Sequence, residues 1–449
     1  YIQPGETKRL MPIMLEAYQG DWQAGVDIYK AWRDTWMKLP ECPTWAKDVH
    51  SWQQIQINSS EDDLRYRFSD LVKIGEDCAR HGVSAIQLVG WNDGGQDRGN
   101  PSHTPDPRLG TFEELKTAIA QVQKLGVKVI LFCKFTWADR STEWYRSELY
   151  QYAAKDPYGD AYYHPGYQYQ TASNLLDVNN RRFSPMCFQS EEYLKICEEE
   201  FQKILDLGAD GMLFDECEHH GTALMCFDET HGHKPGVNLY SNDNELIRRF
   251  QKQIPEGREF LFCGESCYDW EFEAYHAAYI RSYHKDGHTP VSRYLLPYAP
   301  LLSAAIGFND RNLLNQCLMY RYLISYEPYN FKGRLDDYPR TVAYGKLVDD
   351  LRRELRDYFW DGEFRYHYGA RVSTEQGKPY GLYSVFERDD GNKGIVVCND
   401  DWDHPVSVKI EVDGLRKEYK YRTVDAEQWQ ACTGIIRIPP ASAIVAVPV

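Results

Sequence analysis

The chain repeats one unit, a short apolar run followed by a stretch with apolar residues at helical spacing. The run VKVILFC at residues 127–133 is typical of a strand buried on both faces, as in a parallel sheet. The stretch before it, residues 111–125, has helical spacing and ends at Gly126. Because parallel strands need crossover connections, the repeat predicts parallel strands with helices outside them. The expected strands are residues 50–58, 85–89, 127–133, 212–214, 259–266, 277–281, 294–299 and 322–326.

Three parts are expected along the 449 residues. Residues 1–48 are a lead-in segment, interpreted as the end of an upstream β domain plus a helix. Residues 49–368 hold the strand–helix units of a (β/α)8 barrel. From residue 369 the pattern changes to period-2 runs split by turns, which is typical of a small antiparallel β domain. The predicted fold class is therefore α/β, a (β/α)8 TIM barrel followed by a small antiparallel β-sandwich domain.

Composition narrows the classes of partner. A net charge of −16 argues against nucleic acid and an anionic membrane surface, and no apolar stretch is long enough to cross a bilayer. The 12 cysteines contain no C-x-x-C pair and are expected to be mostly reduced, which favours a cytoplasmic location, although the abrupt start can be a trimmed end. Aromatic residues reach 14%, which suits a carbohydrate substrate as well as a large core. The sequence leaves open whether the chain forms a homo-oligomer.

Acidic residues stand at the ends of two apolar runs. Asp215 follows strand 212–214, and Glu265 lies at the end of strand 259–266. These are the fourth and fifth strands, so both acids would be neighbours at the carboxyl end of the barrel, where catalytic groups lie. Neighbouring strands are about 4.8 Å apart, which suits the ~5–5.5 Å separation of a retaining glycosidase pair. Glu216 is expected to point away from Asp215, and rim salt bridges are the structural alternative for the pair.

Two segments, DGMLFD at 210–215 and FCGE at 262–265, resemble motifs of retaining α-glycosidase barrels. The α-amylase superfamily, and more closely the related α-N-acetylgalactosaminidase barrels, carry the nucleophile Asp after strand four and the acid/base Glu after strand five. The resemblance implies these roles for Asp215 and Glu265. The α-galactosidase clan shares the first Asp and a trailing β-sandwich, but its acid/base Asp follows strand six, where residues 282–284 offer no carboxylate, although Asp286 is near. The amylase type also has an Asp after strand seven, for which Asp310 is a candidate; a helix N-cap is its alternative role.

Other residues at predicted strand ends are candidates for substrate binding. The tryptophans would form a stacking floor, and the polar side chains would hold sugar hydroxyls. Packing or a solvated position at the rim is the alternative for each of them. The candidates are Trp91, Asp93, Lys134, Trp137, His219, His284, Asp310 and Arg334.

Residues 217–233 form a second cluster, in which cysteine and histidine are mixed. Such residues can hold zinc, although their spacing matches no standard zinc pattern. Sugar-binding histidines and buried thiols are the alternatives. Two-carboxylate chemistry requires no cofactor, and the sequence leaves open whether zinc or calcium is bound as well. The cluster consists of Cys217, His219, His220, Cys226, His231 and His233.

The leading hypothesis is a glycoside hydrolase that cleaves an α-linked sugar with retention. Asp215 would form the glycosyl-enzyme bond, and Glu265 would protonate the leaving oxygen and then activate water. Activities like those of α-galactosidase and α-N-acetylgalactosaminidase are among the candidates. The alternative is a metal-dependent hydrolase or lyase that uses the Cys217–His233 cluster. A binding protein without turnover would give the strand-end acids no role.

Overall fold

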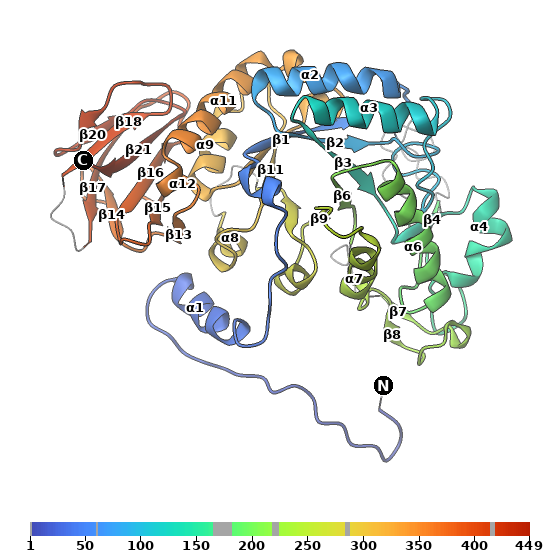
Figure 1. The fold of residues 1–449 in the computed structure, drawn as a ribbon. Coiled ribbons are helices and arrows are strands. Elements are labelled where there is room, and N and C mark those ends of the chain that lie inside the picture. Colours follow the sequence, from blue (N-terminus) through green and yellow to red (C-terminus); the bar gives the residue numbers. More distant parts are fainter. Residues whose placement is uncertain (1, 60–61, 165–181, 218–223, 283–287, 414–417) are drawn as a thin grey trace.

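The computed structural model describes residues 2–59, 62–164, 182–217, 224–282, 288–413 and 418–449 (Figure 1). Eight parallel strands close into a barrel in the order β1-β12-β11-β10-β9-β6-β3-β2, which confirms the predicted barrel. Pairing of β1 with both β12 and β2 closes the ring. The strands are β1 (Ser51–Gln56), β2 (Ala85–Val89), β3 (Lys128–Cys133), β6 (Gly211–Phe214), β9 (Leu261–Glu265), β10 (Ala277–Ile280), β11 (Leu301–Ala305) and β12 (Leu323–Tyr326).

Helices surround the barrel, and α2 and α3 lie side by side on its outside (Figure 1). At the start of α3, Thr111 and Glu114 form a capping box in which each side chain accepts a hydrogen bond from the other's backbone amide. No helix of the described segments combines the length and the apolar character that crossing a membrane requires. The helices are α2 (Leu71–His81), α3 (Phe112–Lys124), α6 (Glu191–Asp206), α7 (Asp243–Gln253), α8 (Val291–Leu295), α9 (Arg311–Tyr320), α10 (Pro328–Phe331), α11 (Pro339–Glu354) and α12 (Arg356–Phe359).

Successive side chains of a barrel strand belong to two different cores. In β3, Val129 and Leu131 pack in the large core outside the barrel, whereas Ile130 and Phe132 belong to the smaller core inside it. Strand side chains alternate between the two faces of a sheet, and both faces are covered here. This burial on both faces is why the strands appear in the sequence as continuous apolar runs.

Two elements differ in position from the prediction. The seventh strand is β11, and residues 294–299 instead hold the end of α8 and the turn after it. Pro297 and Pro300 explain the difference, because proline cannot donate the hydrogen bond that a central strand needs. The segment SEDD at residues 60–63 predicts a helix that opens at Ser60, but the helix starts only at Leu71, after the 3-10 turn η2 (Phe68–Asp70).

The lead-in segment contains the predicted helix, α1 (Trp22–Arg33), followed by the 3-10 helix η1 (Thr44–Asp48). The expected strand is absent from residues 2–20, which form a turn at residues 4–5 and otherwise no regular element. Several apolar side chains of this segment are exposed, among them Ile13 and Leu15. Residues 2–20 therefore do not form the strand that the interpretation as the end of a β domain requires.

The C-terminal part is the predicted small antiparallel β domain. A six-stranded sheet, β13-β15-β16-β21-β18-β19, and a three-stranded sheet, β14-β17-β20, share one apolar core and so form a sandwich. Its first strand begins at Glu363, slightly before the expected boundary at residue 369. The strands are β13 (Glu363–Tyr366), β14 (Ala370–Thr374), β15 (Tyr383–Glu387), β16 (Lys393–Asn399), β17 (Val406–Val412), β18 (Tyr419–Thr423), β19 (Gln430–Ala431), β20 (Ile436–Ile438) and β21 (Ser442–Pro448).

Two long connections follow β3 and β6 and build one side of the barrel mouth (Figure 1). The first connection holds β4 (Trp137–Asp139), α4 (Glu143–Ser147), η3 (Leu149–Tyr152) and β5 (Phe183–Pro185). The second holds β7 (Met225–Cys226), η4 (Glu229–His231) and β8 (Val237–Asn238). Connections of this length in a compact domain are usually functional.

Candidate active site

The carboxyl ends of β6 and β9 bring two acids next to each other. The register pairs residue 214 with residue 264, so Asp215 and Glu265 come next on the two strands. Leu213 and Cys263, two residues earlier, lie in the core inside the barrel. Because side chains two residues apart share a face, Asp215 and Glu265 point into the barrel mouth. The structure therefore unites the two acids that the sequence singles out.

Lys134, directly after β3, is buried among three carboxylates. Its Nζ lies 2.8 Å from Asp215 Oδ2, 2.5 Å from Asp97 Oδ1 and 3.4 Å from Glu216 Oε2. The ammonium also lies 4.4 Å from the centre of the Trp137 ring, which is a cation–π contact. A buried charge is tolerated when it is paired in this way. Lys134, which follows β3, thus pairs with acids that follow the two neighbouring strands, β2 and β6.

Burial has the largest effect on the pKa values of this group. It raises the pKa of Asp215 to about 7, assisted by the charge of Glu265 and a hydrogen bond between the two carboxyl groups, and opposed by Lys134. Burial also raises the pKa of Glu216 well above its usual range. Burial lowers the pKa of Lys134, but the charges of Asp215, Asp97 and Glu216 outweigh this and hold it well above normal. Near neutral pH, Lys134 is therefore charged while the acids share at least one proton.

A further buried acid, Glu327, follows β12. Its Oε1 accepts a hydrogen bond of 2.9 Å from Ser325 Oγ, and burial raises its pKa to about 7 against the effects of Tyr279, Ser325 and Arg281. Arg281 connects this acid to the central pair, because its Nη1 lies 3.5 Å from Glu265 Oε1. The barrel mouth thus holds acids at the ends of β6, β9 and β12. Glu327 was not predicted from the sequence, although it too directly follows an apolar strand.

Aromatic side chains form the wall beside Lys134. Trp137 is almost fully buried, and the His164 ring stacks on it with a centroid separation of 3.9 Å. The indole N–H of Trp137 donates a hydrogen bond to the hydroxyl of Tyr240. Burial and then the negative charge of Glu216 raise the pKa of this tyrosine, so its hydroxyl stays protonated. Trp137 and Tyr240 come from the two long connections, which therefore meet at the site.

Two further acids of the site were not predicted, and both have unusual backbone conformations. Glu216 was expected to point away from Asp215, yet its carboxylate also reaches Lys134. Its φ is 51°, in the left-handed region, so the alternation of an extended strand no longer applies. Asp97 has a φ of 52°, and Ser266, after Glu265, has a φ of 49°. Such strained residues cluster at functional sites, but a single sequence carries no sign of them beyond the glycine-rich loop around Asp97.

Two predicted residues that follow β2 lie away from the charged centre. Trp91 is completely buried, and its Nε1 donates a hydrogen bond of 2.8 Å to the carbonyl of Phe132. It therefore packs between the barrel and its helices and is not a stacking floor for a sugar. Asp93 is exposed, and Asp97, four residues later, contacts Lys134 in its place.

Two further predicted residues have structural partners. Asp310 Oδ2 accepts hydrogen bonds from the amides of Ile306 and Gly307, at 3.1 and 3.0 Å, so it fixes the turn before α9. Arg334 forms an ion pair with Asp77 on α2, with its Nε 2.7 Å from Asp77 Oδ2. The predicted substrate ligands His219 and His284 lie outside the described residues.

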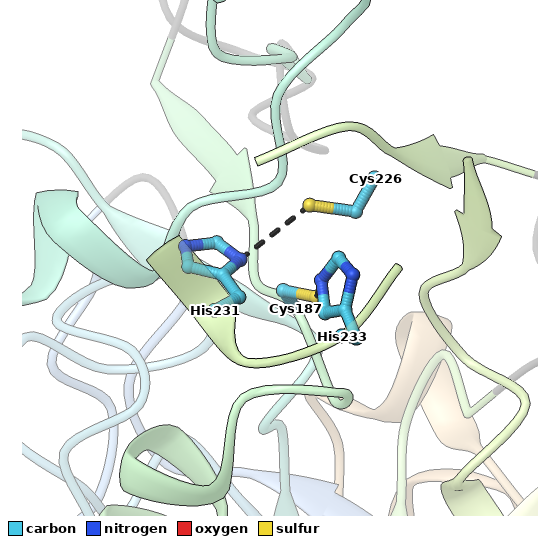
Figure 2. Close-up of side chains that lie close together, drawn as sticks. All are labelled: Cys187, Cys226, His231 and His233. Atoms are coloured by element: carbon cyan, nitrogen blue, oxygen red, sulfur yellow. Dashed lines mark hydrogen bonds between the residues drawn. The ribbon is translucent and has the colours of Figure 1, made fainter. Parts of the chain in front are cut away.

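The structure divides the predicted Cys/His cluster. Cys226, His231 and His233 come together, and Cys187, from the other long connection, joins them (Figure 2). Their ligand atoms all lie within 4.8 Å of one another. Cys187 was not predicted because it lies far along the chain from residues 217–233. His220 lies outside the described residues, as does His219.

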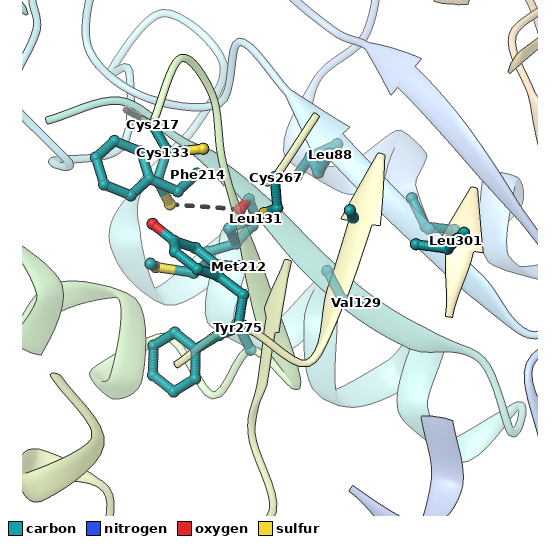
Figure 3. Packing of buried hydrophobic residues seen from close by; sticks show 14 of the residues in the cluster. Leu88, Val129, Leu131, Cys133, Met212, Phe214, Cys217, Cys267, Tyr275 and Leu301 are labelled. Carbon is teal, nitrogen blue, oxygen red and sulfur yellow. Dashed lines mark hydrogen bonds between the residues drawn. The ribbon is translucent and has the colours of Figure 1, made fainter. Parts of the chain in front are cut away.

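Cys217 belongs to a different environment. It is buried with Cys267 in the large core, close to Phe214 and Tyr275 (Figure 3). Its Sγ donates a hydrogen bond of 3.3 Å to the backbone carbonyl of Glu265. Cys217 thus packs behind the acid pair. Its sulfur, the sulfur of Cys267 and a carboxylate oxygen of Glu271 form a second group of possible metal ligands.

One family model matches the sequence, and no curated protein does. The family is described as a domain of unknown function, DUF6259, and the match covers residues 11–295. That range extends from the lead-in segment to the end of α8 and includes the whole acid pair with Lys134.

Three similar solved structures are carbohydrate-active enzymes by name. A noncanonic maltogenic α-amylase from Thermotoga neapolitana is 10% identical, with a TM-score of 0.55 over 90% of this chain and 97% of the other. Trehalose-6-phosphate hydrolase from Bacillus licheniformis is 11% identical, with a TM-score of 0.60 over 90% and 99%. α-N-Acetylgalactosaminidase from Bifidobacterium bifidum is 15% identical, with a TM-score of 0.60 over 84% and 62%. At these identities the similarity shows a shared fold.

Proposed function

The chain belongs to the DUF6259 family, and we propose that it is a glycoside hydrolase that cleaves an α-linked sugar by a retaining double displacement. The observation that carries this proposal is the pair Asp215 and Glu265 at the mouth of a (β/α)8 barrel. The two acids stand on adjacent strands, and the charge of Glu265 helps to raise the pKa of Asp215. The fold shared with α-glycoside-cleaving enzymes supports the same conclusion.

In the proposed mechanism the two acids have different roles. Asp215 attacks the anomeric carbon and forms a glycosyl-enzyme ester, while Glu265 donates a proton to the departing oxygen. Glu265 then takes a proton from water, and the resulting hydroxide displaces Asp215. Retaining pairs stand about 5–5.5 Å apart, whereas inverting pairs leave ~6.5–9.5 Å for a water molecule. Asp215 and Glu265 follow paired residues of two adjacent strands, and the spacing of about 4.8 Å between adjacent strands suits the retaining arrangement.

The surrounding groups suit the binding of a sugar ring in this mechanism. Lys134 holds Asp215 in place and favours its ionised form, which is the nucleophile. Asp97 and Glu216 are almost completely buried and pair with the same ammonium, so they hold Lys134 beside Asp215. Terminal galactosides and N-acetylgalactosaminides are the first candidate substrates, with glucosides next.

A panel of aryl α-glycosides tests the proposed function. We expect hydrolysis of at least one p-nitrophenyl α-glycoside among the galactoside, N-acetylgalactosaminide and glucoside. Proton NMR of the reaction should show the α-anomer of the free sugar first, because two displacements at one carbon restore its configuration. Release of the β-anomer first, or turnover of aryl β-glycosides alone, would contradict the proposal.

The pH dependence of kcat/KM should report the Asp215–Lys134 ion pair. Asp215 is active as an anion and its pKa is raised to about 7, so kcat/KM should fall as the pH drops below that value. Lys134 lowers this pKa, so Lys134→Met should move the acid limb to higher pH by about one unit or more.

Lys128→Met is the matched control for that experiment. Lys128 opens the same strand at its other end, where its Nζ lies 3.0 Å from Asp210. The acid limb of the pH profile of Lys128→Met should coincide with that of the unmodified protein. An unmoved limb in Lys134→Met would show that Asp215 does not control the acid side of the profile.

A further inference from the structure

Four side chains of the two long connections have the geometry of a metal site. Cys187 Sγ lies 3.3 Å from His233 Nε2, and Cys226 Sγ lies 3.5 Å from His231 Nδ1. A tetrahedral zinc ion with Zn–S bonds of about 2.3 Å and Zn–N bonds of about 2.0 Å separates its sulfur and nitrogen ligands by about 3.5 Å. The sulfurs and nitrogens therefore already have the spacing of zinc ligands around a common centre.

The hydrogen bonds of the two histidines orient them toward that centre. His233 Nδ1 donates to the carbonyl of Lys234 at 3.0 Å, and His231 Nε2 donates to the carbonyl of Gln151 at 2.8 Å. A carbonyl can only accept, so these two nitrogens carry the protons. The other nitrogen of each ring, His233 Nε2 and His231 Nδ1, faces a cysteine sulfur. This use of the second ring nitrogen is typical of histidines that bind metals.

We propose that Cys187, Cys226, His231 and His233 bind one zinc ion that joins the connection after β3 to the connection after β6 (Figure 2). Two thiolates and two imidazoles in a tetrahedral arrangement are a donor set that suits zinc. Both cysteines are completely buried, and His231 is 4% exposed. Four protein ligands fill the coordination sphere, as they do in structural zinc sites, and leave no position for a reacting water. The cluster thus has a stabilising role, in contrast to the metal-dependent hydrolase considered from the sequence.

The bound ion would hold the wall of the barrel mouth. Phe188, next to Cys187, packs edge-on against Tyr240 with a centroid separation of 5.5 Å. Cys226 pairs with Val237 in the β7–β8 hairpin, which leads to the same tyrosine. Tyr240 in turn contacts Trp137 beside Lys134. Only this consequence rests on the proposed function; zinc binding itself is independent of it.

Metal analysis of the purified full-length chain tests the proposal. After saturation with zinc chloride and gel filtration, mass spectrometry should find about one zinc ion per chain. Cys226→Ser and His233→Ala should lose most of that zinc. Cys197→Ala is the matched control, since Cys197 is another buried cysteine, on α6, and this variant should keep its zinc. Less than about 0.1 zinc per unmodified chain, or zinc retained by both ligand variants, would overturn the proposal.

Cobalt substitution of the unmodified chain gives a readout that needs no variant. After removal of zinc with a chelator, added Co(II) should give strong visible d–d bands and a near-ultraviolet thiolate-to-cobalt band, the signature of a tetrahedral site with sulfur ligands. A weak octahedral spectrum, or a disulfide between Cys187 and Cys226 in peptide mapping, would reject the site. Catalytic activity enters neither experiment, so failure of the zinc proposal and failure of the glycosidase proposal are distinguishable.

Discussion

Asp215→Asn should reduce kcat for aryl α-glycosides by at least about 10⁴-fold, because an amide oxygen cannot form the glycosyl-enzyme ester. Asparagine has the same shape as aspartate and can still accept a hydrogen bond from Lys134. The loss should therefore appear in turnover and not in the circular dichroism of the folded chain. Steady-state kinetics with a p-nitrophenyl substrate measure it.

A mechanism-based label identifies the nucleophile directly. A 5-fluoro glycosyl fluoride of the accepted sugar should accumulate as an ester on the peptide that contains Asp215. Asp206→Asn is the matched control, since Asp206 is an exposed acid at the end of α6, and its kcat should change less than about twofold. A label on Glu216 or Glu265 would assign the nucleophile differently.

The second large effect is expected for Glu265→Ala, and its size should depend on the leaving group. General acid catalysis contributes about 10²–10⁴-fold, so poor leaving groups should lose that much in kcat/KM. A 2,4-dinitrophenyl glycoside needs little protonation and should lose far less. The glycosyl-enzyme should then persist, because no base activates water.

Azide distinguishes the roles of the two acids. In Glu265→Ala it should attack the glycosyl-enzyme and yield the α-glycosyl azide, with recovery of turnover. In Asp215→Ala it should replace the nucleophile and yield the β-azide. Glu259→Ala is the matched control, because Glu259 lies just before the amino end of β9, where its carboxylate accepts a hydrogen bond from the Thr44 amide. A β-azide from Glu265→Ala would exchange the two assignments.

The barrel and its acid pair were predictable because local sequence carries their signal. Strands buried on both faces appear as apolar runs, and the residue after such a run stands at the barrel mouth. Strand β11 was misplaced because its run, LLSAA, is less strongly apolar than the preceding YLLPYA. The proline in YLLPYA argues against a central strand there. Asp97 and Glu216 were missed because their side-chain directions depend on positive φ values. Cys187 joins its partners only through tertiary folding of two separate connections.

The buried acids of the barrel mouth have a consequence for the stability of the fold. Burial raises the pKa values of Asp215 and Glu327 to about 7, above those of the same groups in an unfolded chain. At pH values between the pKa of these acids in the unfolded chain and their pKa in the folded chain, the folded chain binds protons that the unfolded chain releases. The free energy of unfolding therefore falls as the pH rises through this range. At neutral pH the barrel mouth is thus a destabilising element that the surrounding packing must offset. Such a trade of stability for reactivity is common where acids must be held close together before a substrate arrives.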